Sequence, residues 1–223
     1  MAEEASTIRT DVLIVGAGPA GIFTALGLLR RGDRRSITMV EKGLPIERRR
    51  CPREATGHCA GCSPCRITTG FSGAGAFSDG KLSLSPEVGG DLPQLVGTDV
   101  VADGISRVDD IYLELGADPH VEGVGHPKSV ADIRRRAIKA GLKLVDCPIR
   151  HLGTEKAQQI YARVERELLD AGVNILFEHE CLEVLVQGEK CLGAVVAPTG
   201  RPQAQTRVLA AETVVAKIGR ASC

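Results

Sequence analysis

A six-residue segment near the N-terminus has the composition of a loop that binds a diphosphate. The segment is Gly16-Ala17-Gly18-Pro19-Ala20-Gly21, with glycine at its first, third and last positions. In this pattern the first glycine allows a tight turn, the second lets the backbone approach the phosphates, and the third lets a helix pack closely on a strand. The helix N-terminus then offers free N–H groups and a partial positive charge to the anion. All six residues are therefore predicted to bind a dinucleotide.

An acidic residue at a suitable distance strengthens this prediction. Glu41 comes twenty residues after Gly21 and follows the apolar run 36–40. Its carboxylate can accept hydrogen bonds from both hydroxyls of an adenosine ribose. Lys42, the next residue, is expected to lie at the same cofactor.

A cluster of cysteines follows, with the spacing C-x7-C-x2-C-x2-C. Its members are Cys51, Cys59, Cys62 and Cys65. One interpretation is a four-thiolate site for zinc or an iron–sulfur cluster, because thiolates at C-x2-C spacing can converge on one ion. A second is a redox-active disulfide between Cys62 and Cys65. A third is a set of ordinary unpaired thiols, as we also expect for Cys147, Cys191 and Cys223.

The elements that must position these residues can be read from the apolar pattern. Residues 11–15 and 36–40 read as buried strands around a helix over 18–31, and 43–98 read as a long structured loop. Helices are predicted at 99–115, 130–140 and 155–171, the last with Thr154 as its N-cap. Strands are predicted at 142–145, 174–177, 181–186, 191–197, 206–209 and 213–218.

This order of elements favours FAD over NAD as the dinucleotide. A compact NAD unit would alternate strands and helices, whereas this chain makes a long excursion after residue 42 and returns through a helix, a strand, a three-stranded meander and a last strand. The order is similar to glutathione-reductase-like and hydroxylase-like FAD folds. That similarity implies an α/β, Rossmann-like FAD/NAD(P)-binding domain with a central parallel sheet plus a three-stranded β-meander. It also implies that Cys181 lies near the adenine and Gly219 near the flavin pyrophosphate.

Small residues dominate the segment 70–81, which permits close approach to a planar ring or a diphosphate. In related flavoproteins the equivalent loop lines the flavin, so Gly75 and Ser78 are expected to be cofactor contacts. Asp79 and Lys81 are candidate catalytic residues near the flavin, together with Cys62 and Cys65. A plain surface turn is the alternative for this segment. His151 is a candidate acid or base, or else a residue that caps the following helix.

Two longer segments resemble one particular family. The stretch CPREATGHCAGCSPCRITTGFSGAGAFSDGKLSLSPEVGG (51–90) and the stretch VDCPIRHLGTEKAQQI (145–160) look like bacterial and archaeal FAD-dependent dehydrogenases, also called NAD(P)/FAD-dependent oxidoreductases. The resemblance implies hydride or electron transfer through FAD, with NAD(P)H as a possible electron donor and a small molecule or redox protein as partner. Members of that family are longer, with a cap region and a second FAD-contacting segment in their C-terminal half.

We therefore expect a truncated N-terminal portion of such an enzyme. The expected organisation is one FAD-binding domain over 1–223, made of a βαβ unit (1–42), the Cys/Gly-rich loop (43–98), a helical insertion (99–150) and the returning elements (151–223). Three alternatives stay open: a fragment without activity, an NAD-binding module, and a thiolate-metal electron-transfer module.

Composition excludes some classes of function. The chain has 28 basic and 28 acidic residues and few aromatic ones, which argues against nucleic-acid binding. The run Arg48-Arg49-Arg50 is expected to be a solvated loop face or a contact for a cofactor phosphate. We recognise neither a signal peptide nor a stretch apolar enough for a membrane span, so a cytoplasmic location is expected.

Overall fold

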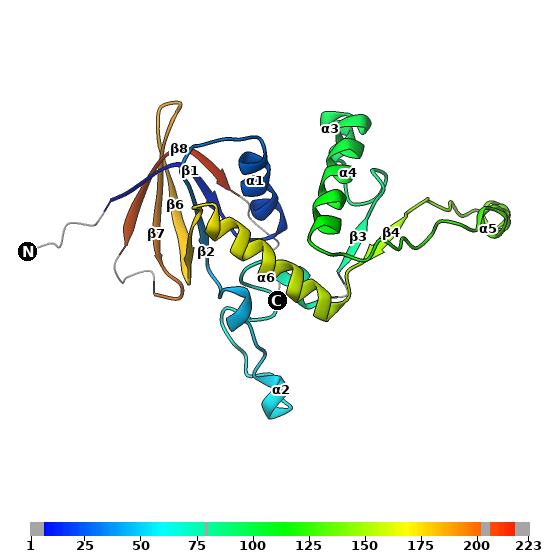
Figure 1. Ribbon diagram of the computed structural model, residues 1–223, viewed down its shortest axis with the longest axis horizontal. Helices are drawn as coiled ribbons and strands as arrows, with labels where there is room; N and C mark the ends of the chain where they lie inside the picture. The colour runs from blue at the N-terminus through cyan, green and yellow to red at the C-terminus, as the bar shows by residue number, and fades with distance from the viewer. Residues whose placement is uncertain (1–6, 79, 202–205, 217–223) are drawn as a thin grey trace, which may run out of the picture. The chain divides into compact units, whose positions relative to one another are not determined.

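The computed structural model describes residues 7–78, 80–201 and 206–216, so Asp79 and Gly219 lie outside the described residues. The chain divides into two compact units (Figure 1). Unit 1 comprises Met1–Phe77 and Tyr161–Cys223, and unit 2 comprises Ser78–Ile160. Each unit is described by itself.

Unit 1 is built on a six-stranded sheet with the strand order β5-β2-β1-β8-β7-β6. The strands are β1 (Ile8–Val15), β2 (Ile37–Glu41), β5 (Asn174–Phe177), β6 (His179–Gln187), β7 (Lys190–Pro198) and β8 (Arg207–Ala216). Strands β5, β2, β1 and β8 run parallel, whereas β7 is antiparallel to both β8 and β6. The α/β prediction, with a parallel core followed by a meander, is confirmed.

The first strand and helix follow directly from their sequences. β1 carries Val12, Leu13 and Ile14, all buried, as expected for a strand covered on both faces. The helix α1 (Pro19–Arg30) begins with proline, whose fixed φ suits a first helical position. A Cβ on Gly21 would lie 2.0 Å from the Gly16 carbonyl oxygen, so the third glycine of the motif is required for the close packing of α1.

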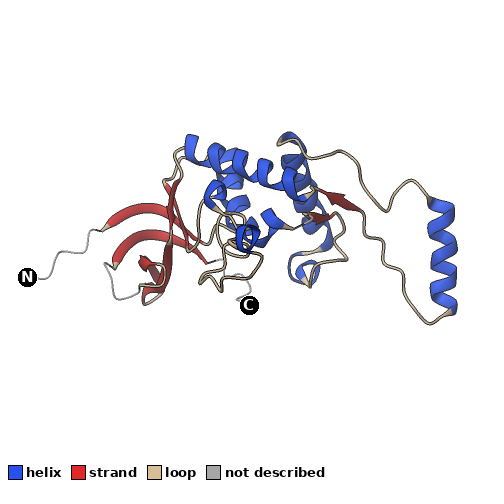
Figure 2. Cartoon of the chain, turned by 90° about the horizontal axis from the view of Figure 1, so that it is seen from below, coloured by secondary structure: helices blue, strands red, loops and turns tan. Residues whose placement is uncertain are grey.

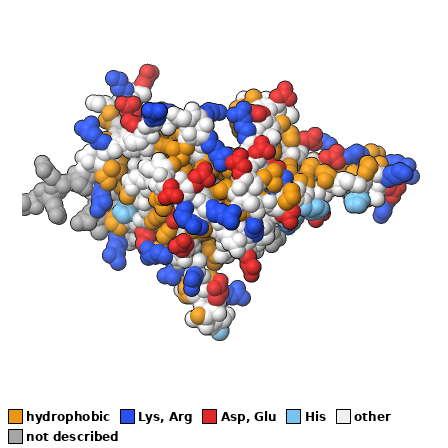
Figure 3. All heavy atoms as spheres, viewed as in Figure 1, with side chains coloured by type: hydrophobic (Ala, Val, Ile, Leu, Met, Phe, Trp, Pro, Cys, Tyr) orange, Lys and Arg blue, Asp and Glu red, His pale blue; other side chains and the backbone are white. Residues whose placement is uncertain are grey.

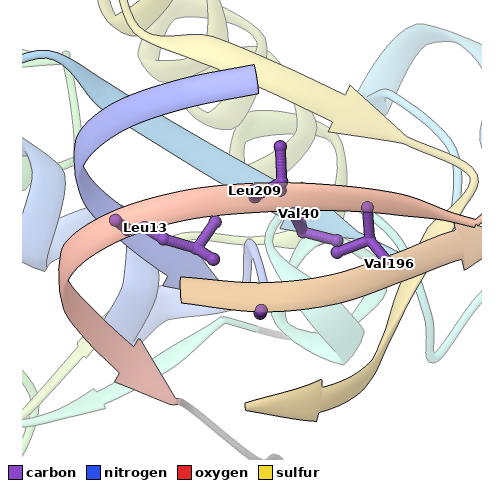
Figure 4. Packing of buried hydrophobic residues seen from close by; sticks show 6 residues of the cluster. Leu13, Val40, Val196 and Leu209 are labelled. Atoms are coloured by element: carbon purple, nitrogen blue, oxygen red, sulfur yellow. The ribbon is translucent and has the colours of Figure 1, made fainter. Parts of the chain in front are cut away.

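The core of unit 1 joins residues from four strands. Leu13 of β1, Val40 of β2, Val196 of β7 and Leu209 of β8 pack in one buried cluster (Figure 4). Backbones also come close here, because a Cβ on Gly193 would lie 1.9 Å from the Leu209 carbonyl oxygen. The meander is therefore part of the same core as the dinucleotide-binding strands.

One prediction about the end of the sheet is wrong. The runs 206–209 and 213–218 were predicted as two strands, but β8 (Arg207–Ala216) is continuous. Its middle residues Ala210 and Ala211 pair with Arg9 and Thr10 of β1. The strand contains no glycine or proline that would interrupt it. A single strand therefore pairs with both the parallel part of the sheet and the meander.

The helix α6 (Thr154–Asp170) begins in unit 2 and continues into unit 1, and it confirms the helix predicted over 155–171. In unit 1 it buries Tyr161, Val164 and Leu168. Thr154 was predicted to cap it, but the Thr154 hydroxyl donates to the Ser78 carbonyl at 3.4 Å instead.

The long loop after β2 carries only short elements within unit 1. These are the 3₁₀ turns η1 (Ile46–Arg48) and η2 (Gly73–Phe77) and the helix α2 (Arg53–Thr56). The prediction of a long structured loop is confirmed over this part of the chain.

Unit 2 contains a two-stranded antiparallel sheet and three helices. The elements are β3 (Lys81–Ser83), β4 (Ile149–His151), α3 (Leu92–Val96), α4 (Thr98–Glu114) and α5 (Pro127–Lys139). The helices predicted at 99–115 and 130–140 correspond to α4 and α5, and Figure 2 shows α5 at the end of two extended loops. The strand predicted at 142–145 is wrong, because those residues belong to a loop. β3 and β4 were missed because each has only three residues and is specified by its partner.

Candidate functional site

The turn between β1 and α1 presents an open helix N-terminus. Gly16 has φ +97°, and its N–H donates to the Val40 carbonyl at 2.8 Å. Gly18 is the N-cap residue of α1, and no side chain caps the helix. A Cβ on Gly18 would meet no atom within 4 Å, whereas one on Gly21 would clash with the backbone. Gly18 is thus the glycine that leaves room for a ligand, as the motif predicts for the residue facing a diphosphate.

Glu41 lies beside this turn, at the end of β2. It is buried, and its two carboxylate oxygens accept the N–H groups of Ala17 at 2.9 Å and of Gly43 at 2.8 Å. A carboxylate has about four acceptor positions, so two bonds leave positions for the two hydroxyls of a ribose. The glycine turn and the acidic residue that the sequence singled out are therefore neighbours in the structure.

The small-residue segment packs against the same turn. The Ser72 N–H donates to the Ala17 carbonyl at 2.7 Å. Gly43 and Gly70 touch so closely that a Cβ on Gly43 would lie 2.5 Å from the Gly70 Cα. A Cβ on Gly73 would lie 3.9 Å from the Pro19 Cδ. Glycine is needed at 43 and 70 because two backbone segments meet there without room for a Cβ, whereas Gly73 is in ordinary van der Waals range of Pro19. The Ser72 bond to Ala17 holds the small-residue segment beside the N-terminus of α1.

Arg49 organises this segment, and sequence reasoning missed it. Its side chain is 2% exposed and lies 4.6 Å from the centre of the Phe77 ring. The guanidinium donates to the carbonyl oxygens of Arg66 (3.0 Å), Ile67 (2.5 Å), Phe71 (2.5 Å) and Gly73 (2.7 Å). Burial lowers the pKa of Arg49 to about 10, so it stays cationic at neutral pH. The expectation of a solvated arginine run is wrong at this residue, because a loop without regular structure leaves carbonyls that need a donor.

The four cysteines of the loop are not gathered into a metal site. Cys59 is exposed, and Cys51, Cys62 and Cys65 are partly buried. Among the residues that the structure describes, no group of three or more His, Cys, Asp or Glu side chains is placed to hold a metal ion. The helix α2 separates Cys51 from Cys59 along the loop. The structure therefore gives no support to the four-thiolate interpretation.

A cavity of about 710 Å³ lies in unit 1 next to Lys42. Its lining residues are Lys42, Gly43, Leu44, Glu47, Arg48, Arg50, Cys62, Ser63, Pro64, Arg66, Thr69, Glu178 and Thr199. Four of these are basic and two are acidic, and Arg48 pairs with Glu178 at 3.2 Å. The cavity therefore suits a ligand with negative charge.

Two candidate catalytic residues come together in unit 2. Lys81 of β3 and His151 of β4 are cross-strand partners, and both are exposed. Lys81 also lines a second cavity of about 460 Å³, whose other walls are mainly aliphatic side chains of α3 and α4. Arg150 is buried instead, and it donates to the Asp109 carboxylate at 2.6 and 2.8 Å.

The remaining predicted cofactor contacts lie in both units. Gly75 is partly buried in η2 of unit 1, and Ser78 is exposed in unit 2. Cys181 of β6 is partly buried against the core cluster, and burial raises the pKa of its thiol. None of the described helices is long and apolar enough to cross a membrane.

The sequence of residues 90–222, more than half of the chain, matches the model of a family described as FAD binding domain. The chain belongs to this FAD binding domain family. The match begins after the glycine motif, so it is independent of the turn and of Glu41. No curated protein matches the sequence.

Solved structures of similar fold agree with this family. A 3-ketosteroid dehydrogenase of Rhodococcus jostii is 14% identical with a TM-score of 0.58, and the match covers 94% of this chain and 45% of that one. The quinol fumarate reductase FrdA of E. coli is 18% identical with a TM-score of 0.54, covering 96% and 33%. THI4 of Thermovibrio ammonificans is 14% identical with a TM-score of 0.50, covering 96% and 58%. This chain thus spans between 33% and 58% of the length of these three structures. At these identities the likeness shows the fold.

Proposed function

We propose that the chain is the FAD-binding portion of a flavin-dependent oxidoreductase. The observation that carries the proposal is the buried Glu41 carboxylate bonded to Ala17 N–H at 2.9 Å, beside the open N-terminus of α1. FAD would place its diphosphate at Gly16–Gly21 and its adenosine ribose at Glu41. When bound, the flavin supplies hydride or electron transfer, and the protein supplies position and electrostatics.

Other residues have proposed roles around this centre. Arg49 holds the backbone of 66–73 through its carbonyls and so positions η2 with Gly75 beside α1. Lys42 is proposed to contact the adenosine side, as is Cys181. Lys81 and His151 are proposed to hold or move a proton near the substrate. The fit to FAD is supported by Gly18 of the glycine turn, where an added Cβ would meet no protein atom within 4 Å.

The test is titration of the purified chain with FAD, followed by flavin fluorescence and absorbance. Gly18→Ala should weaken binding at least tenfold, about 1.4 kcal/mol, because the new Cβ takes the space of the diphosphate. Gly27→Ala is the matched control, since Gly27 is another glycine of α1 with no atom within 4 Å of an added Cβ. Equal affinity in the two variants, or no binding by the unmodified chain, would contradict the proposal.

NAD(P)H is proposed as the electron donor on the strength of the family resemblance alone. Anaerobic addition of NADH or NADPH to the FAD-loaded chain should bleach the visible absorbance of the flavin, because hydride transfer reduces the cofactor. A chain that binds FAD but is never bleached would be the inactive fragment considered above.

A further inference from the structure

The cavity of unit 2 lies between β3, α3 and α4, and its volume is about 460 Å³. Small-molecule sites in proteins typically occupy about 300–1,000 Å³ and have mostly apolar walls with a few polar groups. Eight of the twelve residues that line this cavity are Leu, Val or Ile. All twelve belong to unit 2, so the cavity shares no residue with the glycine turn or with Glu41.

Several aliphatic side chains of this lining are exposed to water. Leu92 and Val96 of α3 are 54% and 47% exposed, and Val100 of α4 is 61% exposed. Single exposed aliphatic residues are common, but several that line one cavity form an apolar surface that is typical of a binding site. A bound apolar group would remove this surface from water, which favours binding.

A glycine in the middle of α4 keeps the cavity open. Gly104 lines the cavity, although glycine is less favourable than any residue except proline inside a helix. A Cβ at this position would meet no atom within 4 Å, and its backbone is helical. Neither packing nor backbone conformation therefore requires glycine here. The missing side chain instead leaves room for an occupant between α4 and β3.

The charged residues of the lining are Lys81 and Asp109. The Asp109 carboxylate is already bonded to the Arg150 guanidinium at 2.6 and 2.8 Å, so its charge is balanced within the protein. Lys81 is exposed in β3 and supplies a positive charge at the wall of the cavity. A ligand with an aliphatic body and one negative group is thus complementary to the lining.

We propose that this cavity binds a medium-chain aliphatic carboxylate. The alkyl chain lies against the aliphatic residues of α3 and α4 beside Gly104, and the carboxylate lies at Lys81. The cavity of about 460 Å³ has room for roughly fifteen groups of the volume of a water molecule, about 30 Å³ each. Decanoate, with about twelve non-hydrogen atoms, fits within this space on the same scale.

The test is isothermal titration of the full chain with decanoate, in the absence of FAD. Saturable binding of one decanoate per chain is expected. Octanoate should bind about fifteenfold more weakly, because each buried methylene group contributes about fourfold in affinity. The neutral 1-decanol should bind about two- to fivefold more weakly than decanoate at low salt, and decylamine more weakly than 1-decanol. The preference for decanoate over 1-decanol should fall as salt screens Lys81.

Variants test the two ends of the site separately. Gly104→Leu should weaken decanoate binding at least tenfold, because the new side chain fills the cavity. Ala102→Leu is the matched control, since Ala102 is an exposed residue of the same helix outside the lining and its substitution should leave the affinity unchanged. Lys81→Gln should remove the preference for decanoate over 1-decanol and leave the affinity for 1-decanol unchanged.

Three results would overturn the proposal. They are a lack of saturable binding up to about 1 mM decanoate, equal affinities for octanoate and decanoate, and equal affinities in the Gly104→Leu and Ala102→Leu variants. Self-association of the chain that Gly104→Leu abolishes and decanoate does not disturb would also overturn it, since the cavity would then hold a second copy. The ligand series uses the unmodified chain, so it tests the proposal even where a variant fails to fold. Because no FAD is present, its failure is distinct from a failure of FAD binding.

Discussion

Ser72 combines two unfavourable features at a single residue. Its φ is +71°, a region that glycine adopts freely and serine rarely does. Its hydroxyl oxygen is buried and has no hydrogen-bond partner among the described residues. A buried hydroxyl without a partner costs about 1–3 kcal/mol. The backbone N–H of Ser72 nevertheless makes a useful contact, because it donates to the Ala17 carbonyl of the glycine turn.

Ser72→Gly is therefore expected to raise the free energy of unfolding by about 1 kcal/mol, since it removes both the positive-φ strain and the orphaned hydroxyl. Urea denaturation measures the change. Ser72→Ala removes only the hydroxyl and should give a smaller gain. A loss of more than 1 kcal/mol in the glycine variant would show that the hydroxyl has a partner.

Glu165 is a carboxylate whose burial matters for pH dependence. It is buried in α6 and accepts the Ile46 N–H at 2.9 Å. Burial, and to a lesser extent the charge of Glu47, raises the pKa of Glu165, while the Ile46 bond opposes the shift. A raised folded-state pKa means that the folded chain prefers the protonated form. Its stabilising contribution is complete below about pH 4.3, the unfolded value, and is lost as the pH rises through the folded pKa.

Glu165→Gln should therefore be more stable than the unmodified chain at pH 7, because the amide oxygen still accepts the Ile46 N–H without a buried charge. The difference should shrink as the pH is lowered towards 4. Denaturant midpoints at several pH values measure it. Glu167→Gln, at a half-exposed residue of the same helix, should change stability by less than about 0.5 kcal/mol at every pH. The explanation is contradicted if the stability gain of Glu165→Gln over the unmodified chain is smaller at pH 7 than at pH 4.

At the scale of elements, an ion pair joins β4 to α4 within unit 2. The Arg150 and Asp109 side chains are 5% and 15% exposed, and Arg150 also donates to the Asp118 carbonyl at 2.6 Å. The hydrogen bond to Asp109 raises the pKa of Arg150, so the guanidinium stays charged at all ordinary pH values. The Arg150 side chain therefore connects β4 to α4 and to the segment that carries Asp118.

Asp109→Ala should destabilise the chain by about 3 kcal/mol, because it leaves a buried guanidinium without its carboxylate. Asp103→Ala is the matched control on the same helix. The Asp103–Arg107 pair is more than half exposed on both sides, and its loss should cost less than about 1 kcal/mol. If the two variants lose similar amounts of unfolding free energy, the buried Arg150–Asp109 pair contributes no more to stability than the exposed Arg107–Asp103 pair.

At the scale of the whole molecule, charges of both signs are interspersed on the face shown in Figure 3, and the chain has 28 basic and 28 acidic residues. The proposed cofactor would therefore act through a local site rather than through the net field. FAD at one hundred times its Kd should stabilise the folded chain by about 2.7 kcal/mol. For a chain of this size that corresponds to a rise in Tm of roughly 5–10 °C. Gly18→Ala should reduce the rise to about half or less at the same FAD concentration, because binding at least tenfold weaker leaves at most about 1.4 kcal/mol of stabilisation. An undiminished rise would place the cofactor elsewhere.

The sequence by itself determined the parts of this protein whose signals are local. The glycine spacing, the apolar runs of β1 and β2 and the acidic Glu41 are read within the 31 residues from Asp11 to Glu41, and the structure brings them together as expected. Helices α1, α4 and α6 follow from apolar periodicity, which depends only on residues a few positions apart. The resemblance to FAD-dependent dehydrogenases was likewise read from two continuous segments, 51–90 and 145–160.

Only the tertiary structure decided the features that depend on distant partners. β3 and β4 are distant in the sequence, since the paired residues Ser83 and Ile149 are 66 positions apart (149 − 83), and neither strand is visible without the other. β8 is one strand because β1 and β7 supply its hydrogen bonds from both sides. Arg49 is buried because an irregular loop needs its carbonyls satisfied. Whether the loop cysteines gather into a metal site is likewise decided by the fold, and among the described residues they do not. Strand pairing and the burial of polar groups depend on residues that are distant in the sequence, so local sequence patterns cannot predict them.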